Sequence, residues 1–326
     1  MSFHMVPTIL PDRYSVENLR RVFENPRLLR RELFNWTLRI NSRSRRVLNA
    51  LSGTDENIDI IAADWDNLIL LDACRYDLFD ARNQLDGDLQ SVRSKGSDSW
   101  EFMNANFAGR TLHDTVYVTA NPHVYELPDN TFHAVENLLE TRWDEEAGTV
   151  RPAAVVEEAI KALDRYPEKR LIVHFMQPHF PFLGPTGQTF DHMGIKDLDA
   201  AERSDAPNPW FGLIYEDTVD AETVLTAYRE NLDLLFPHVE RLLEILSGKS
   251  VVTSDHGNLI GERGFPIPMR MYGHPRGLNR DEVRTVPWLE LETADRRRII
   301  SEPPQQDETE PNDDVVEDRL SALGYV

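Results

Sequence analysis

Residues 221–257 read AETVLTAYRENLDLLFPHVERLLEILSGKSVVTSDHG. Up to Leu246, apolar side chains recur three and four positions apart, which is the spacing of one buried face of a helix. The next segment, Ser250–Thr253, is a short apolar run typical of a buried strand. A helix that leads directly into such a strand is the repeating unit of a wound parallel sheet, so we expect an α/β fold.

Four further apolar runs upstream are predicted strands of the same sheet. They are mostly continuous rather than alternating, as expected where helices cover both faces of a sheet. The chain of 326 residues is long enough to bury a sizeable core. We therefore expect a doubly wound, mostly parallel sheet with helices on both faces. The four runs are Asn67–Leu71, Leu89–Ser94, Thr115–Thr119 and Leu171–Phe175.

The remaining segments suggest a domain with appendages. We expect a helical N-terminal extension over residues 1–57 and a main domain over 58–300. Residues 301–316 are acidic and contain prolines, so they predict a flexible linker. Residues 317–326 are expected to pack back on the domain. Residues 184–217 are rich in Pro, Gly and Asp and predict a long surface excursion.

The N-terminal extension combines an apolar stripe with many arginines. Helical spacing over residues 14–50 places Leu29, Leu33, Trp36 and Ile40 on one stripe. Residues 1–50 contain ten arginines against four acids. Two interpretations stay open. The stripe packs against the parent domain, which is the commoner case, or the helix lies on an anionic membrane surface.

The whole chain is strongly acidic. Asp and Glu number 56 against 35 Lys and Arg, for a net charge of -21. This balance argues against a nucleic-acid partner, because binding to phosphates needs basic surface. It favours a halophilic protein, whose carboxylates are screened in high salt.

Cys74 is the only cysteine, which excludes an internal disulfide. No run is long and apolar enough to cross a bilayer, so we expect a cytoplasmic protein.

Polar side chains follow every predicted strand. In open α/β sheets ligands bind outside the carboxyl ends of the strands, so we expect these side chains to meet. Such a convergence of carboxylates, imidazoles and hydroxyls is uncommon at purely structural strand ends. In chain order they are Asp72, Arg75 and Asp77; Ser97 and Ser99; Asn121 and His123; Gln177 and His179; and Asp255 with His256.

Asp72, Asp255 and His256 together suit one divalent cation. Their hard oxygen and imidazole donors favour Mn²⁺ or Zn²⁺, with Mg²⁺ or Ca²⁺ as alternatives. Asp72 alone also has an ordinary structural interpretation, since an aspartate at a strand end can cap the following helix. Turns do not require an adjacent Asp-His pair before glycine, which favours the metal interpretation for Asp255 and His256.

The segment SKGSDSWEF (94–102) offers a nucleophile. Ser97 and Ser99 precede a predicted helix over Trp100–Phe107, whose N-terminal amides can bind an oxyanion. A serine becomes a good nucleophile when its proton is removed or a metal binds its oxygen. The same serines can also be plain helix caps. Arg75 and Lys95 can neutralise a phosphate or sulfate, or can be exposed solubilising charges.

Several segments together resemble the alkaline phosphatase/sulfatase superfamily, in its sulfatase and phosphodiesterase branch. The matches run in the family's order over about residues 64–326; DHG alone is weak, and the ordered set is specific. VRTVPWLE (283–290) and RLSALGYV (319–326) are similar to the closing segments of sulfatase-like chains. The stronger matches are NLILLDACRYD (67–77), SKGSDSW (94–100), HFMQPHFPF (174–182), YRENLDLLFPHVERLLEIL (228–246) and VVTSDHGNLIGERG (251–264).

The resemblance implies roles for individual residues. Asp72 matches the first metal-ligand carboxylate, and Asp255 with His256 match the later ligands. Relatives that read G-S-x-T-x-P-S place the nucleophilic, metal-bound hydroxyl at Ser99. The T-S-D-x-E-F motif of lipoteichoic acid synthases would choose Ser97 instead, and we favour Ser99. His179 matches a histidine at the transferred group or leaving oxygen. The candidate substrate-binding residues are Arg75, Lys95, Asn121 and His274. His274, in YGHPRG, matches a late active-site histidine or is a plain loop residue.

The sequence also departs from the family's pattern. No segment fits the C/S-x-P/A-x-R motif that yields formylglycine, the paired acid D-D reads Asp72-Ala73, and no D-x-x-x-H lies between the nucleophile and Asp255. We therefore expect a single-metal hydrolase or phosphotransferase of phosphate mono- or diesters, with Ser99 attacking and His179, rather than His274, protonating the leaving oxygen. The alternatives are a sulfatase with an unmodified serine, a glycan or lipid-headgroup transferase held at a membrane by residues 1–50, and a non-catalytic binding protein.

Overall fold

The centre of the molecule is a seven-stranded sheet with the strand order β2-β11-β8-β1-β7-β3-β4. The structure is a computed structural model, and it describes residues 26–52, 56–190, 209–211, 213, 219–292 and 295–304. β11 runs antiparallel to both neighbours, and the other strands run in one direction. The strands are β1 (Asn67–Asp72), β2 (Asp88–Arg93), β3 (Leu112–Thr119), β4 (Phe132–Asn137), β7 (Arg170–Pro178), β8 (Ser250–Ser254) and β11 (Thr285–Leu291).

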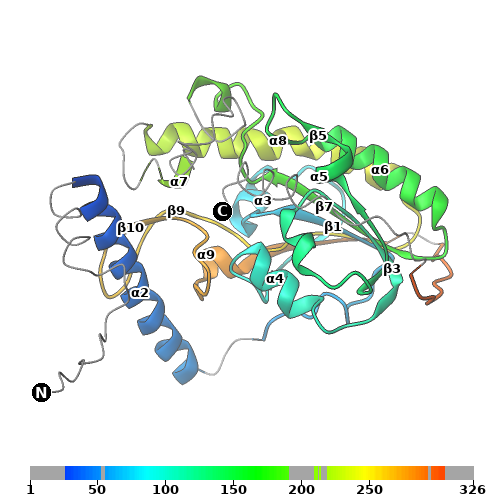
Figure 1. Ribbon diagram of the computed structural model, residues 1–326, viewed down its shortest axis with the longest axis horizontal. Coiled ribbons are helices and arrows are strands. Elements are labelled where there is room, and N and C mark those ends of the chain that lie inside the picture. The colour runs from blue at the N-terminus through cyan, green and yellow to red at the C-terminus, as the bar shows by residue number, and fades with distance from the viewer. Residues whose placement is uncertain are drawn as a thin grey trace, which may run out of the picture.

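Helices cover the sheet on both faces (Figure 1). Because side chains alternate along a strand, β1 sends Ile69 and Leu71 into one core and Leu68 and Leu70 into the other. The first core packs against α3 (Tyr76–Arg82), α6 (Pro152–Arg165) and α8 (Ala221–Ile245). The second packs against α4 (Ser99–Asn106) and η2 (Pro122–Glu126). The expected doubly wound, mostly parallel α/β fold is confirmed.

The five predicted strands and the long helix before the last of them are all present. Two strands of the sheet, β4 and β11, were not predicted. β11 contains Pro287, a residue that usually argues against a strand inside a sheet. The short elements are α5 (Leu138–Thr141), β5 (Trp143–Asp144), β6 (Thr149–Val150), η3 (Gly187–Thr189), α7 (Pro209–Phe211), β9 (Leu259–Arg263), β10 (Arg270–Gly273) and α9 (Asp281–Arg284).

The N-terminal helix, α2 (Pro26–Ser52), lies beside the β9–β10 hairpin (Figure 1). Its buried face carries Phe34, Thr37 and Asn41, and Leu38 packs on a small cluster of the hairpin and the loop after it. Of the predicted stripe, Leu33, Trp36 and Ile40 are exposed instead, and Leu29 is partly buried. The interpretation in which the stripe packs against the domain does not hold for the three exposed residues, because the neighbouring face of the helix is the one that contacts the hairpin.

The appendages are described in part. The residues that lie outside the described ranges are 14–25 of the predicted helix, 191–208, 212 and 214–217 of the predicted excursion, most of the predicted linker and all of 317–326. The first residues of the linker are tied to the domain, since Glu302 bonds the His113 carbonyl through its amide and Lys169 through its carboxylate. Within the described ranges, no helix has the length and apolarity needed to span a membrane.

Candidate metal and nucleophile site

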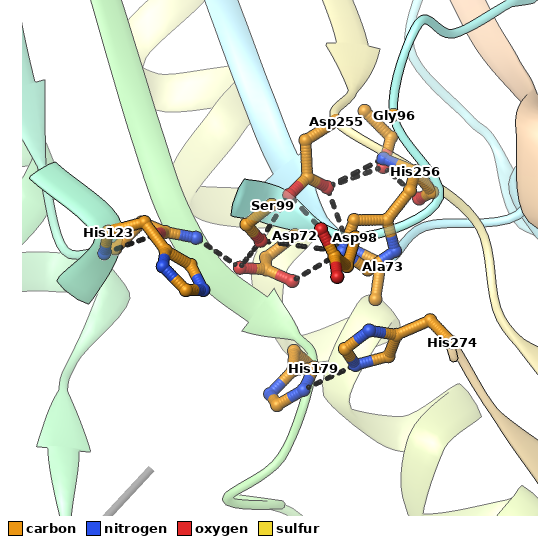
Figure 2. Close-up of polar contacts among 12 residues, drawn as sticks. Asp72, Ala73, Gly96, Asp98, Ser99, His123, His179, Asp255, His256 and His274 are labelled. Carbon is orange, nitrogen blue, oxygen red and sulfur yellow. Dashed lines mark hydrogen bonds and ion pairs between the residues drawn. The ribbon is translucent and has the colours of Figure 1, made fainter. Parts of the chain in front are cut away.

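Four buried polar side chains meet where β1 and β8 end (Figure 2). Asp72 is the last residue of β1, Asp255 and His256 directly follow β8, and Ser99 is the first residue of α4. The ligand atoms of Asp72, Asp255 and His256 all lie within 4.8 Å of one another. The parallel register of β1 with β8 brings these distant parts of the sequence to one edge.

Each carboxylate is held by one oxygen and presents the other to the centre. Asp255 Oδ1 accepts the backbone N–H groups of Ala73 at 3.0 Å and His256 at 2.8 Å. Asp255 Oδ2 accepts the Ser99 hydroxyl at 2.6 Å. Asp72 Oδ2 accepts the Asn121 amide at 2.7 Å. Asp72 Oδ1 is buried and accepts no hydrogen bond from the described residues.

The ring of His256 is oriented as a metal ligand would be. Its Nδ1 lies 2.8 Å from the Gly257 carbonyl, so Nδ1 carries the proton and Nε2 keeps its lone pair. Nε2 lies 3.4 Å from Ser99 Oγ, 3.4 Å from Asp255 Oδ2 and 3.8 Å from Asp72 Oδ1. Two carboxylate oxygens, one imidazole nitrogen and one hydroxyl therefore face a common point, and this donor set fits a divalent cation.

The backbone at the site is constrained to hold these directions. Ala73 has a φ of 57°, a left-handed conformation that is costly for a residue other than glycine. It turns the chain out of β1 and points its N–H at Asp255. Gly257 lies so close to α9 that an added Cβ would be 2.4 Å from the Glu282 carbonyl oxygen. This contact explains why glycine follows the Asp-His pair.

Two carboxylates are buried beside each other at the site, and the pKa values of both are shifted. Burial, and then the charge of Asp255, raises the pKa of Asp72 well above its ordinary value. Burial also acts to raise the pKa of Asp255, but the imidazoles of His256 and His174 and the bonds from Ser99 and Ala73 outweigh it, so that this pKa is lowered. Two buried carboxylates beside each other are the arrangement that a cation would neutralise.

A pair of histidines lies beside the carboxylates (Figure 2). His179 Nε2 and His274 Nε2 are 3.1 Å apart, and the rings of His274 and His256 are 4.4 Å apart. His179 Nδ1 lies 2.6 Å from the Phe180 carbonyl and must donate to it, so the proton between the two Nε2 atoms belongs to His274. Burial lowers the pKa of His179 to about 4, and it lowers that of His274 well below its ordinary value.

Three candidates from the sequence take structural positions instead. Ser97 Oγ bonds Glu101 at 2.7 Å and accepts the Gly277 amide at 2.9 Å, so its hydroxyl is used within the loop. Lys95 pairs with Asp59 at 2.9 Å. The guanidinium of Arg75 bonds Asp77, Glu262 and the Asn258 carbonyl. We therefore assign no anion-binding role to Arg75 or Lys95, because protein groups already take up these charges.

Asn121 was expected to bind substrate, but its side chain bonds protein groups instead. Its Nδ2 donates to Asp72 Oδ2 at 2.7 Å, and its Oδ1 accepts the His123 backbone N–H at 3.0 Å. It therefore orients a ligand carboxylate and caps η2. His123 itself, whose Nδ1 lies 2.6 Å from Glu126, extends from η2 near the carboxylates (Figure 2).

Sequence reasoning missed a buried pair behind the site. Tyr117 Oη lies 2.7 Å from His174 Nδ1, and His174 Nε2 lies 3.9 Å from Asp255 Oδ2. Burial lowers the pKa of His174 to about 4, so the ring is neutral at neutral pH. A histidine inside the apolar run Leu171–Phe175 was the signal, since a polar ring in a fully covered strand needs a partner.

No protein-family model matches this chain, and no curated protein matches it. Solved structures do. The integral membrane protein lipooligosaccharide phosphoethanolamine transferase A from Neisseria meningitidis is 14% identical, with a TM-score of 0.45 over 68% of this chain, which spans about half (47%) of that protein.

Two further structures are similar. A putative sulfatase from Bacteroides thetaiotaomicron is 13% identical, with a TM-score of 0.44 over 71% of this chain and 65% of its own. A protein in the alkaline phosphatase superfamily from Vibrio parahaemolyticus is 12% identical, with a TM-score of 0.39 over 89% of this chain and 75% of its own.

Proposed function

We propose that this chain is a metal-dependent enzyme that transfers a phosphoryl group from a phosphate mono- or diester, through Ser99, to water or to an acceptor alcohol. The carrying observation is the convergence of the Asp72 and Asp255 carboxylates, His256 Nε2 and Ser99 Oγ on one buried point. A structural role alone does not explain why a buried carboxylate oxygen of Asp72 accepts no hydrogen bond from the described part of the chain.

Asp72, Asp255 and His256 would hold the cation, with Ser99 as the fourth ligand. A divalent cation bound there lowers the pKa of the Ser99 hydroxyl and stabilises negative charge on the transferred group. The hydroxyl proton already lies on a 2.6 Å hydrogen bond to Asp255 Oδ2 and can leave along that bond as the oxygen attacks. Asn121 keeps Asp72 from rotating during this step.

The leaving oxygen needs a proton, and the structure favours His274 as its donor. His179 commits its Nδ1–H to the Phe180 carbonyl, so its Nε2 is an acceptor, whereas His274 Nε2 carries a proton. In the first half-reaction the Ser99 Oγ–P bond forms as Asp255 takes the hydroxyl proton, the P–O bond to the leaving group breaks, and the leaving oxygen takes the Nε2 proton of His274. In the second, water or an alcohol displaces Ser99 and gives its proton to His274, and Ser99 takes its own proton back from Asp255.

The proposed substrates are phosphate esters as a class rather than one individual compound. The absence of a formylglycine motif favours phosphate over sulfate, and a sulfatase with an unmodified serine is the second candidate. Lipid headgroups and glycans are included among the phosphate esters. Cytoplasmic location and adaptation to high salt stay predictions from composition.

Turnover of aryl esters tests the proposal. The purified chain is stripped with chelator, reloaded separately with Mn²⁺, Zn²⁺, Mg²⁺ or Ca²⁺, and given p-nitrophenyl phosphate, bis-p-nitrophenyl phosphate or p-nitrophenyl sulfate. We expect phosphate ester turnover only with metal, and a loss of at least about 10³-fold in Ser99→Ala. Turnover of the sulfate alone would replace the phosphate assignment with the second candidate.

Ser97→Ala is the matched control for the nucleophile. It removes a buried hydroxyl that bonds Glu101 and the Gly277 amide, so we expect a stability loss of about 1–2 kcal/mol with turnover within about tenfold of wild type. A phosphoryl adduct seen by mass spectrometry in wild type and Ser97→Ala, but not in Ser99→Ala, supports the covalent step. The opposite pattern would assign the attack to Ser97.

A further inference from the structure

The exposed large apolar side chains of the described residues are unevenly distributed. There are eight of them, and five belong to α2 and the turn of the β9–β10 hairpin. Leu33 (58% exposed), Trp36 (51%) and Ile40 (40%) lie on α2, and Phe265 (67%) and Ile267 (36%) lie in the turn. We call these five residues the apolar patch. Apolar side chains that gather in this way mark an interaction surface.

The two segments of the apolar patch are joined by specific hydrogen bonds. Asn41, on α2, donates from Nδ2 to the Ile267 carbonyl at 3.1 Å, and its Oδ1 accepts the Ile267 N–H at 3.0 Å. Because Asn41 follows Ile40 directly, the tip of the hairpin lies beside the C-terminal end of the exposed stripe. Residues that are more than 220 positions apart in sequence are thus held side by side.

The charge around the apolar patch is opposite to that of the rest of the chain. α2 contains seven arginines and one acid, and the turn RGFPIPMR (263–270) contains two arginines and no acid. Arg39, Arg43, Arg263 and Arg270 are exposed. The whole chain nevertheless has a net charge of -21. An acidic body with one basic, apolar face is attracted to an anionic surface in a single orientation.

We propose that the apolar patch docks this chain on an anionic phospholipid bilayer, with Trp36, Phe265 and their neighbours in the headgroup region and the arginines on lipid phosphates. A tryptophan and aliphatic side chains beside arginines are the composition of interfacial helices. A second copy of the chain is a poorer occupant. A twofold contact sets each patch against itself and therefore sets arginines against arginines.

The docking face also leads to the candidate site. β10 runs from the turn back to Gly273, and the next residue is His274. At about 3.3 Å per strand residue, Ile267 and His274 are at most roughly 23 Å apart along the chain. A docked chain would hold its site near the headgroup layer. The docking proposal does not depend on the proposed chemistry, because the patch and the site share no residue.

Flotation with vesicles tests the proposal. The full chain is mixed with vesicles of phosphatidylcholine and phosphatidylglycerol, or of phosphatidylcholine alone, and bound protein is quantified. We expect binding to the anionic vesicles that is at least about tenfold stronger than to the neutral ones and that weakens with added salt. Trp36→Glu combined with Phe265→Glu should reduce binding by at least about tenfold.

A matched variant and two further measurements separate the outcomes. Leu234→Glu with Ile245→Glu places the same charges at exposed apolar positions of α8 and should bind like wild type. Turnover of a soluble aryl ester should be the same in all variants, and unchanged circular dichroism shows that they fold. Failure of wild type to float, or equal binding by both double variants, overturns the proposal. So does a dimer by light scattering that only Trp36→Glu with Phe265→Glu dissociates, without vesicle binding.

Discussion

Replacing Asp72 by asparagine should make the metal-free protein more stable and the metal-loaded protein less stable. Without a cation, Asp72 and Asp255 are two buried carboxylates whose ligand atoms lie within 4.8 Å. At that distance and an effective dielectric constant of about 20, their repulsion is about 3.5 kcal/mol. The raised pKa of Asp72 relieves part of this repulsion, so we expect Asp72→Asn to gain about 1–2 kcal/mol in chelator.

With metal present the order should reverse. A cation at 100 times its dissociation constant stabilises wild type by about 2.7 kcal/mol. Loss of a ligand oxygen should weaken binding by more than about 100-fold, which leaves the variant a gain of about 0.4 kcal/mol or less at the same metal concentration. The asparagine keeps an oxygen for the Asn121 amide, so that hydrogen bond survives the change.

Thermal and urea unfolding of wild type and Asp72→Asn, in chelator and in Mn²⁺ or Zn²⁺, measure the stability difference without and with metal. At about 2–4 °C per kcal/mol, the midpoint of the variant should lie about 2–8 °C above that of wild type in chelator and roughly 1–5 °C below it with metal. A purely structural Asp72 would give a variant that is less stable under both conditions by the same amount. That result, or a wild type whose midpoint does not respond to any divalent cation, refutes the metal site.

Three further outcomes are expected. Asn121→Ala should lower metal affinity by about 10–100-fold in calorimetric titrations, because Asp72 Oδ2 loses its donor. His274→Ala should slow alkyl phosphate esters by about 10²–10⁴-fold and p-nitrophenyl esters much less, because only a poor leaving group needs the proton. The pKa of Asp59 is lowered, chiefly by its bond to Arg110, so its carboxylate stabilises the fold above pH ~4 and that contribution is lost as the pH falls. Asp59→Asn should therefore reduce stability at neutral pH and flatten its acid dependence in urea titrations.

The central sheet could be predicted because its strands are covered on both faces. A continuous apolar run such as Leu68–Leu71, short and followed at once by polar residues, is typical of a buried strand, and the polar residue that ends it marks the ligand edge. β4 and β11 lie toward the sheet edges, and their partly exposed residues and Pro287 hide the signal. The pairing of β11 with β2 also depends on contacts that are distant in sequence.

The sequence was enough to predict which residues are candidate ligands. It was not enough to predict which hydrogen-bond partner each side chain has. The motifs favoured Ser99 but left Ser97 as an alternative, and only the loop around Gly277 shows that Ser97 is already bonded. Arg75 was a reasonable anion ligand until Glu262, nearly two hundred residues later, came beside it. A propensity or a motif indicates which bonds a side chain is able to make. Its neighbours in the folded structure determine which of these bonds it makes.

For helix α2 as well, the sequence alone does not predict which face is buried, and the exposed face is the one proposed to bind lipid. Periodicity selects the stronger apolar stripe, Leu33, Trp36 and Ile40, and the usual inference buries it. The hairpin instead binds the adjacent face, where Asn41 satisfies both backbone groups of Ile267. Burial of that face therefore rests partly on polar pairing, which leaves the more apolar stripe exposed beside arginines. If the stripe served only the fold, Trp36→Glu with Phe265→Glu would lower stability and leave vesicle binding unchanged, whereas docking requires the reverse.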